Sequence, residues 1–113
     1  NLDVAIEALK DYLNKSLSLK NDIHRIQKTV AEFYKVRVDD LKSNRRTYEI
    51  SYPRQVAMYL SRKLTDESFI KIGMEFGGKN HSTVIHACDK IERDIKCNKE
   101  IKNMIDNLIQ QLK

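Results

Sequence analysis

A run of short polar side chains, Asn-His-Ser-Thr at residues 80–83, follows the glycine pair Gly77-Gly78. Asn can pair with adenine, Ser and Thr can bond several base edges, and the Thr methyl can touch a thymine methyl. Glycine accepts the left-handed backbone that ends a helix, and an apolar stripe from Val84 indicates that another helix begins here. Two helices joined by such a turn form a helix-turn-helix candidate, which presents the start of its second helix to base edges. Since these residues are also ordinary helix caps, the spacing alone leaves a purely structural turn open.

A basic segment lies upstream of this turn. Between residues 44 and 63 only Glu49 opposes five cations, which are Arg45, Arg46, Arg54, Arg62 and Lys63. Arg45 and Arg46 are adjacent in a stretch, residues 44–52, that lacks helical periodicity and is predicted to be a loop. Guanidinium groups there could bond phosphates or enter a narrow minor groove. A solvated surface is the alternative, although no i,i+4 partner explains two arginines in a loop.

The remaining pattern predicts helices that position these groups. One proline and three glycines among 113 residues favour an all-α, compact helical domain. The first expected helix is Leu2–Leu13, and the second is capped by Asn21 or Asp22 and buries Ile23, Ile26, Val30 and Phe33. A short helical turn capped by Asp39 follows, and then a helix that starts at Pro53 and leaves Arg54 outside. The last three expected helices are one capped by Ser68, one from about Asn80 to Asn98, and Ile101–Leu112.

Composition narrows the function classes. A formal charge of +5 suits nucleic acid, an anionic membrane or an acidic protein, although lysines on solvated helix faces account for much of it. Cys88 and Cys97 lie nine residues apart along a helix axis, too far to bond. Free thiols indicate a reducing compartment. Without a membrane-spanning run or an opening signal peptide, we expect a cytoplasmic protein.

The segment FGGKNHSTVIHA, residues 76–87, resembles the signature of the DnaA family of bacterial chromosomal replication initiators, FGGR(D/N)H(S/T)TVxHA. The run IQKTVAEFY (26–34), Arg45-Arg46 and Pro53-Arg54-Gln55 fall in register with the same family. The resemblance implies a Trp-repressor-like helix-turn-helix domain over residues 21–113. It also implies that residues 1–20 form a linker helix toward the family's ATPase domain.

By this resemblance the chain would bind double-stranded DNA at the DnaA box, a short origin site with a consensus like TTATNCACA. The resemblance implies major-groove contacts from Asn80, His81, Ser82, Thr83, Ile70 and Lys79; minor-groove contacts from Arg46, supported by Arg45; and phosphate contacts from Arg54, Gln55, Arg62 and Thr47. Lys79 stands where the family usually has Arg, and it keeps the charge without the planar fork. Asn80 is neutral where Asp is common, and Tyr48 replaces a residue that is basic in some relatives.

The sequence holds little that predicts catalysis. A phosphate loop of the form GxxxxGK(S/T) is absent, so ATP and Mg²⁺ are expected only on the family's ATPase domain, and an enzyme is not expected. His81 and His86 lie off a common helix face and make a poor zinc set with Cys88. His86 is predicted to form a hydrogen bond within the fold. Because self-assembly in the family depends on the ATPase part, this chain is expected to be monomeric and associated with the nucleoid.

A second function class remains open. The stripe Leu2, Ile6, Leu9 and Leu13, with lysines nearby, resembles an interfacial helix that docks on an anionic membrane or a protein. The DnaA family is associated with acidic phospholipids around this linker. Packing of the stripe against the domain itself or a neighbour is the simpler alternative.

Overall fold

The structure, a computed structural model, describes residues 23–112. The described elements are α2 (Ile23–Tyr34), α3 (Val38–Lys42), α4 (Tyr48–Leu64), α5 (Phe69–Glu75), α6 (His81–Cys97) and α7 (Lys99–Leu112). This part of the chain contains no strand, so the predicted all-α class is confirmed. The predicted helix in residues 1–20 and the caps at Asn21 or Asp22 lie outside the described residues.

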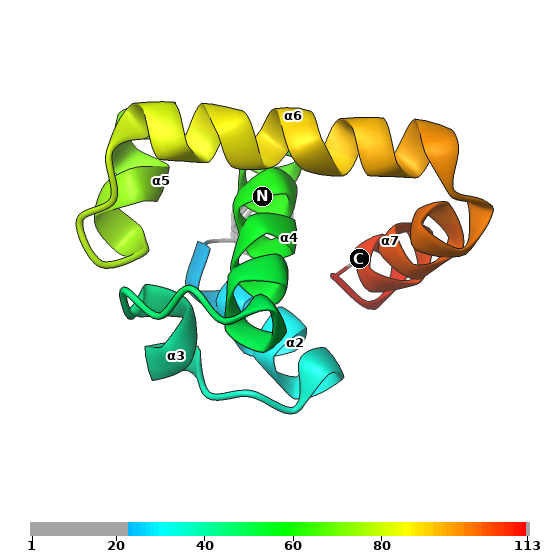
Figure 1. The fold of residues 1–113 in the computed structure, drawn as a ribbon, viewed down its shortest axis with the longest axis horizontal. Coiled ribbons are helices and arrows are strands. Elements are labelled where there is room, and N and C mark those ends of the chain that lie inside the picture. Colours follow the sequence, from blue (N-terminus) through cyan, green and yellow to red (C-terminus); the bar gives the residue numbers. More distant parts are fainter. Residues whose placement is uncertain (1–22, 113) are drawn as a thin grey trace, which may run out of the picture.

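Helix α4 is the centre of the fold. It crosses beneath the middle of α6, while α5 and α7 lie under the two ends of α6 and α2 packs against the other side of α4 (Figure 1). The core between them consists mainly of Ile26, Val30, Leu41, Val56, Leu60, Ile72, Phe76, Val84, Ile91 and Leu108, all fully buried. No helix within residues 23–112 is both long and apolar enough to cross a membrane.

The predicted helix cap at Ser68 is confirmed, and the expected helix boundaries at Asn80 and Asn98 are capped as well. The Ser68 hydroxyl accepts a hydrogen bond from the Lys71 backbone N–H at 3.1 Å. The Asn80 side chain accepts a hydrogen bond from the Ser82 N–H at 2.9 Å. Asn98 is the C-cap of α6, and its side-chain oxygen accepts a hydrogen bond from the Glu100 N–H at the start of α7. Each cap satisfies a backbone donor that has no partner within the helix.

The predicted start of α4 at Pro53 is wrong. The helix begins at Tyr48, and Thr47 is its N-cap. Pro53 therefore lies inside the helix, where it cannot donate a backbone hydrogen bond to the Glu49 carbonyl. This first turn was not predicted because α4 is central and buries residues on more than one side. Ile50 and Tyr52 are both buried, and their i,i+2 spacing does not match a single apolar stripe of a helix. The predicted loop shortens to residues 43–47, which we call the basic loop.

Two predictions about the first described helices are also wrong. Phe33 was expected in the core, yet it is 42% exposed. Gln27 is buried instead, and its side-chain amide donates a 2.9 Å hydrogen bond to the Glu75 carbonyl at the end of α5. Asp39 is not a cap: Arg37 is the N-cap residue of α3, and its backbone N–H bonds the Asp40 carboxylate at 3.1 Å.

Alkaline unfolding should report on Tyr52. Burial, and then the negative charge of Asp94 that accepts its hydroxyl hydrogen bond, raises the pKa of Tyr52 from 10.0 to about 12. Because the folded-state pKa is the higher one, its contribution to the free energy of unfolding is complete below pH 10 and is lost between pH 10 and about 12. Tyr52→Phe should therefore lessen the decline in stability across that window, measured by urea unfolding. An identical decline in both proteins would contradict this assignment.

Candidate nucleic-acid interface

The turn between α5 and α6 depends on two left-handed glycines. Gly77 and Gly78 have φ values of +86° and +75°. The Gly78 N–H bonds the Met74 carbonyl at 3.3 Å, and the Lys79 N–H bonds the Gly73 carbonyl at 2.8 Å. These bonds use carbonyl groups at the end of α5 and reverse the chain into α6, as the glycine pair predicted.

The first residues of α6 form an exposed surface. Asn80, His81, Ser82 and Thr83 are all exposed, and burial begins at Val84; we call these four residues the reading tip. The Asn80 oxygen caps the helix, and its amide nitrogen can still donate to acceptors on base edges. His81, Ser82 and Thr83 keep their side chains free for solvent or a ligand at the helix N-terminus.

The basic loop presents two arginines to solvent. The Arg45 guanidinium lies 3.9 Å from the Asp40 carboxylate, and this exposed pair is weak. The Arg46 side chain is exposed and makes no hydrogen bond or ion pair with other residues in the range 23–112. Arg46 is therefore the cation of this loop that is available for an external anion.

Arg54 does not point outward as predicted. It is only 7% exposed, and burial lowers its pKa. Its guanidinium donates hydrogen bonds to the Leu41 carbonyl (2.9 Å), the Arg45 carbonyl (2.9 Å), the Asp40 carbonyl (3.1 Å) and the Ser43 hydroxyl (3.3 Å). Since the planar fork is engaged inside the protein, Arg54 organises the basic loop. The phosphate contact expected from Arg54 stays a prediction.

Lys79 also faces inward in this structure, and its expected major-groove contact stays a prediction. Its ammonium donates to the Phe76 carbonyl at 2.9 Å and to the Lys42 carbonyl at 3.3 Å. Burial, with a smaller contribution from the Arg54 charge, lowers the pKa of Lys79. Lys42 is the last residue of α3, directly before the basic loop, so Lys79 fastens the turn to the start of that loop.

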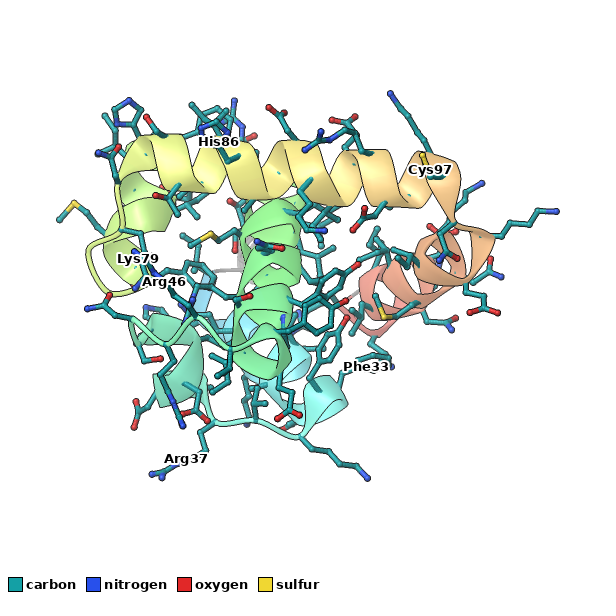
Figure 2. The ribbon with its side chains drawn as sticks, in the orientation of Figure 1. Phe33, Arg37, Arg46, Lys79, His86 and Cys97 are labelled. Carbon is teal, nitrogen blue, oxygen red and sulfur yellow. The ribbon has the colours of Figure 1, made fainter. Side chains whose placement is uncertain are left out.

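The same contact places the reading tip beside the basic loop. A Cβ on Gly77 would meet the Lys42 carbonyl, so the turn rests directly on the end of α3. Figure 2 shows Lys79 and Arg46 at this junction, below the start of α6. The contact thus connects the turn that leads into the reading tip with the residue that precedes the basic loop.

The other predicted contact residues lie at several places on α4, α5, α6 and the basic loop. Gln55 and Thr83 line one groove of about 380 Å³ between α4 and α6. Ile70 is 62% exposed on α5, and Thr47 is exposed at the end of the basic loop. Arg62 lies apart, at the far end of α4, where its guanidinium is 4.4 Å from the Phe69 ring centre and bonds the Glu67 carbonyl at 2.9 Å.

The groove contains residues that the sequence prediction missed. His86, Lys90 and Arg93 line it together with Thr83. Their spacing of three, seven and ten residues from Thr83 places them on one face of α6, which was the available signal. His86 is exposed on this helix (Figure 2), so the predicted hydrogen bond within the fold is wrong. Lys90 is engaged with Asp94 at 3.2 Å.

Comparison with known proteins identifies the family. A sequence profile described as the bacterial dnaA protein helix-turn-helix matches residues 23–91. The chain belongs to this family. A solved structure described as a DNA replication initiation factor superposes on the dnaA-type domain with a TM-score of 0.74 and 31% identity. The match covers 96% of this chain and 33% of that chain, so the sequence spans about a third of the solved relative.

Family membership identifies which part of the family this domain is. It assigns the matched segment of this dnaA-type domain, from α2 into α6, to the helix-turn-helix part of the family and not to an ATPase part. Within residues 23–112, no group of three or more His, Cys, Asp or Glu side chains is placed to hold a metal ion. The chemistry available at the junction is hydrogen bonding and charge, which suits recognition of a polyanion.

Proposed function

We propose that this dnaA-type domain binds double-stranded DNA sequence-specifically at DnaA boxes of a replication origin. The reading tip enters the major groove, and Arg46 enters the adjacent minor groove. The observation that carries this proposal is the contact between the Gly77 turn and Lys42, which sets the exposed tip beside the exposed arginine loop. A single duplex that contacts both the reading tip and the basic loop would present a different, neighbouring groove to each of them.

Affinity and selectivity come from different groups. Thr47, Gln55 and Arg62 contact phosphates, and Arg45 supports Arg46 at the minor groove. Neutralising phosphate charge releases counterions, which makes binding dependent on salt. The reading tip supplies hydrogen bonds to base edges in the major groove. Arg46 responds to the width and potential of the minor groove, which vary with sequence. Arg54 supports these contacts by shaping the loop.

Titration against two duplexes at two salt concentrations tests the proposal. One duplex carries a DnaA box, and the other carries the same bases in scrambled order. The domain should bind the box more tightly at both salt concentrations, and raised salt should weaken binding to both duplexes. Equal affinity for the two duplexes would contradict sequence-specific recognition.

Thr83→Ala should selectively weaken box binding. Thr83 is exposed at the reading tip, and losing a base contact should cost about 1–3 kcal/mol on the box and less on the scrambled duplex. His81→Ala should behave in the same way. Asn103→Ala, an exposed polar residue on α7, is the matched control and should change neither affinity. Equal losses on both duplexes would remove the altered residue from base recognition.

Acidic phospholipids are a second proposed partner. The apolar stripe Leu2–Leu13 with its nearby lysines has the composition of an interfacial helix. Deleting residues 1–20 should abolish binding to vesicles of acidic phospholipid and leave box binding intact. Vesicle binding that survives the deletion would contradict this second proposal. ATP and Mg²⁺ are proposed to act on a separate ATPase domain, and the present chain is proposed to be monomeric.

A further inference from the structure

Two large apolar side chains on α5 are exposed beside the reading tip. Ile70 is 62% exposed and Met74 is 67% exposed, one helical turn apart. Two other large apolar residues in the described region are exposed, Phe33 and Tyr48, and neither lies on α5. Ile70 and Met74 together form a strip, which we call the α5 strip. The Ile70 contact was expected by family resemblance, whereas nothing so far explains Met74.

Neighbouring residues fix the direction in which the α5 strip faces. Successive residues of an α-helix turn by about 100°. Gly73 faces α6, because a Cβ there would meet the Lys79 carbonyl and lie 3.5 Å from a Val84 methyl. Glu75 faces α2, because its carboxylate is 3.4 Å from the His24 ring. Met74 lies between these two directions on the outward side of α5, and Ile70 lies closer still to the α6 side.

The strip is continuous with the proposed DNA surface. The Met74 carbonyl accepts the Gly78 N–H of the turn, so Met74 lies where α5 meets the segment leading into the reading tip. Arg62 lies over the ring of Phe69, the residue that precedes Ile70 in α5. The α5 strip is exposed and adjoins residues proposed to bind DNA. Its apolar side chains could therefore contact an apolar group of the DNA. The methyl group of thymine is the apolar feature in the major groove.

We propose that Met74 extends the apolar contact of Ile70 and determines sequence preference by touching thymine methyl groups beside the reading tip. This inference rests on the proposed box binding and adds to it a residue and the base feature that the residue recognises. A methionine suits this contact because its unbranched, polarizable side chain adapts to the position of a small apolar group. The contact transfers no charge and forms no hydrogen bond, so it should depend little on salt.

Deoxyuridine substitution tests this inference at the level of one methyl group. Each thymine of the box is replaced in turn by deoxyuridine, which lacks only the 5-methyl group, and the affinity of each duplex is measured. The wild-type domain should bind roughly fourfold more weakly at each contacted thymine, the effect of one buried methyl group. Met74→Ala should remove this penalty at one set of thymines, and Ile70→Ala should remove it at a different set.

Matched variants separate the contact from general effects. Met74→Leu keeps the volume and the apolar character, so it should keep the penalties. Phe33→Ala removes an exposed apolar side chain on α2 and should leave every penalty unchanged. Met74→Ala that retains every deoxyuridine penalty would overturn the inference, as would a wild-type domain that prefers the box but is insensitive to all the substitutions. Equal binding of box and scrambled duplexes would instead overturn the proposed function itself, and the contact with it.

Discussion

Gly77→Ala is expected to destabilise the domain far more than Gly78→Ala. Both glycines have left-handed φ values, +86° and +75°, where a Cβ costs about 1–2 kcal/mol. At Gly78 the new methyl would meet nothing within 4 Å, so this strain is the whole expected loss. At Gly77 the methyl would also meet the backbone carbonyl of Lys42, and the total loss should be about 3–5 kcal/mol. Urea unfolding of the three proteins measures both values.

Gly73→Ala separates the clash from the backbone strain. Gly73 lies in α5 with ordinary helical geometry, yet a Cβ there would meet the Lys79 carbonyl, which is also backbone. This variant should therefore lose stability through the clash alone. If Gly77→Ala costs no more than Gly78→Ala, the turn does not rest on the end of α3, and the support for a reading tip beside the basic loop is lost.

The sequence predicted features whose cause is local. The glycine turn, the cap at Ser68 and the helix boundaries at Asn80 and Asn98 are each set by a few adjacent residues, which are visible in a single sequence. Residues 80–83 were expected at the start of α6 for the same reason. The exposed tip follows from where the apolar stripe begins, at Val84.

Features set by distant contacts were not predicted. Arg54 looks like a surface cation in a basic segment, and only the folded chain shows three backbone carbonyls converging on it. Lys79 is turned inward for the same reason, by the Lys42 carbonyl 37 residues away in sequence. Phe33 fits the periodicity of α2, but the neighbouring helices do not cover its position. In each case the outcome depends on how helices pack, which periodicity does not encode.

Arg54→Ala is expected to weaken box binding through the basic loop. The substitution removes the Arg54 donor from the Leu41 and Arg45 carbonyl groups and one of several donors from the Asp40 carbonyl and the Ser43 hydroxyl, which should cost about 2–4 kcal/mol of stability. The loop that carries Arg46 should then lose its fixed position, because the Arg45 carbonyl is one of the released groups. Arg46→Ala should lose box affinity directly. Titrating both variants against the box and the scrambled duplex measures these losses.

A double-mutant cycle shows whether Arg54 acts through Arg46. If it does, the variant with both substitutions should bind the box little worse than Arg54→Ala alone, with a coupling energy of about 0.5–3 kcal/mol. Arg54→Lys should bind as poorly as Arg54→Ala, because an ammonium keeps the charge but cannot reproduce the fork that holds four acceptors. A direct phosphate contact gives the opposite pattern: additive losses, a salt dependence flattened by about one unit in Arg54→Ala, and rescue by lysine. Those results would show that Arg54 contacts DNA directly, and they would contradict the claim that it acts by holding the basic loop in position.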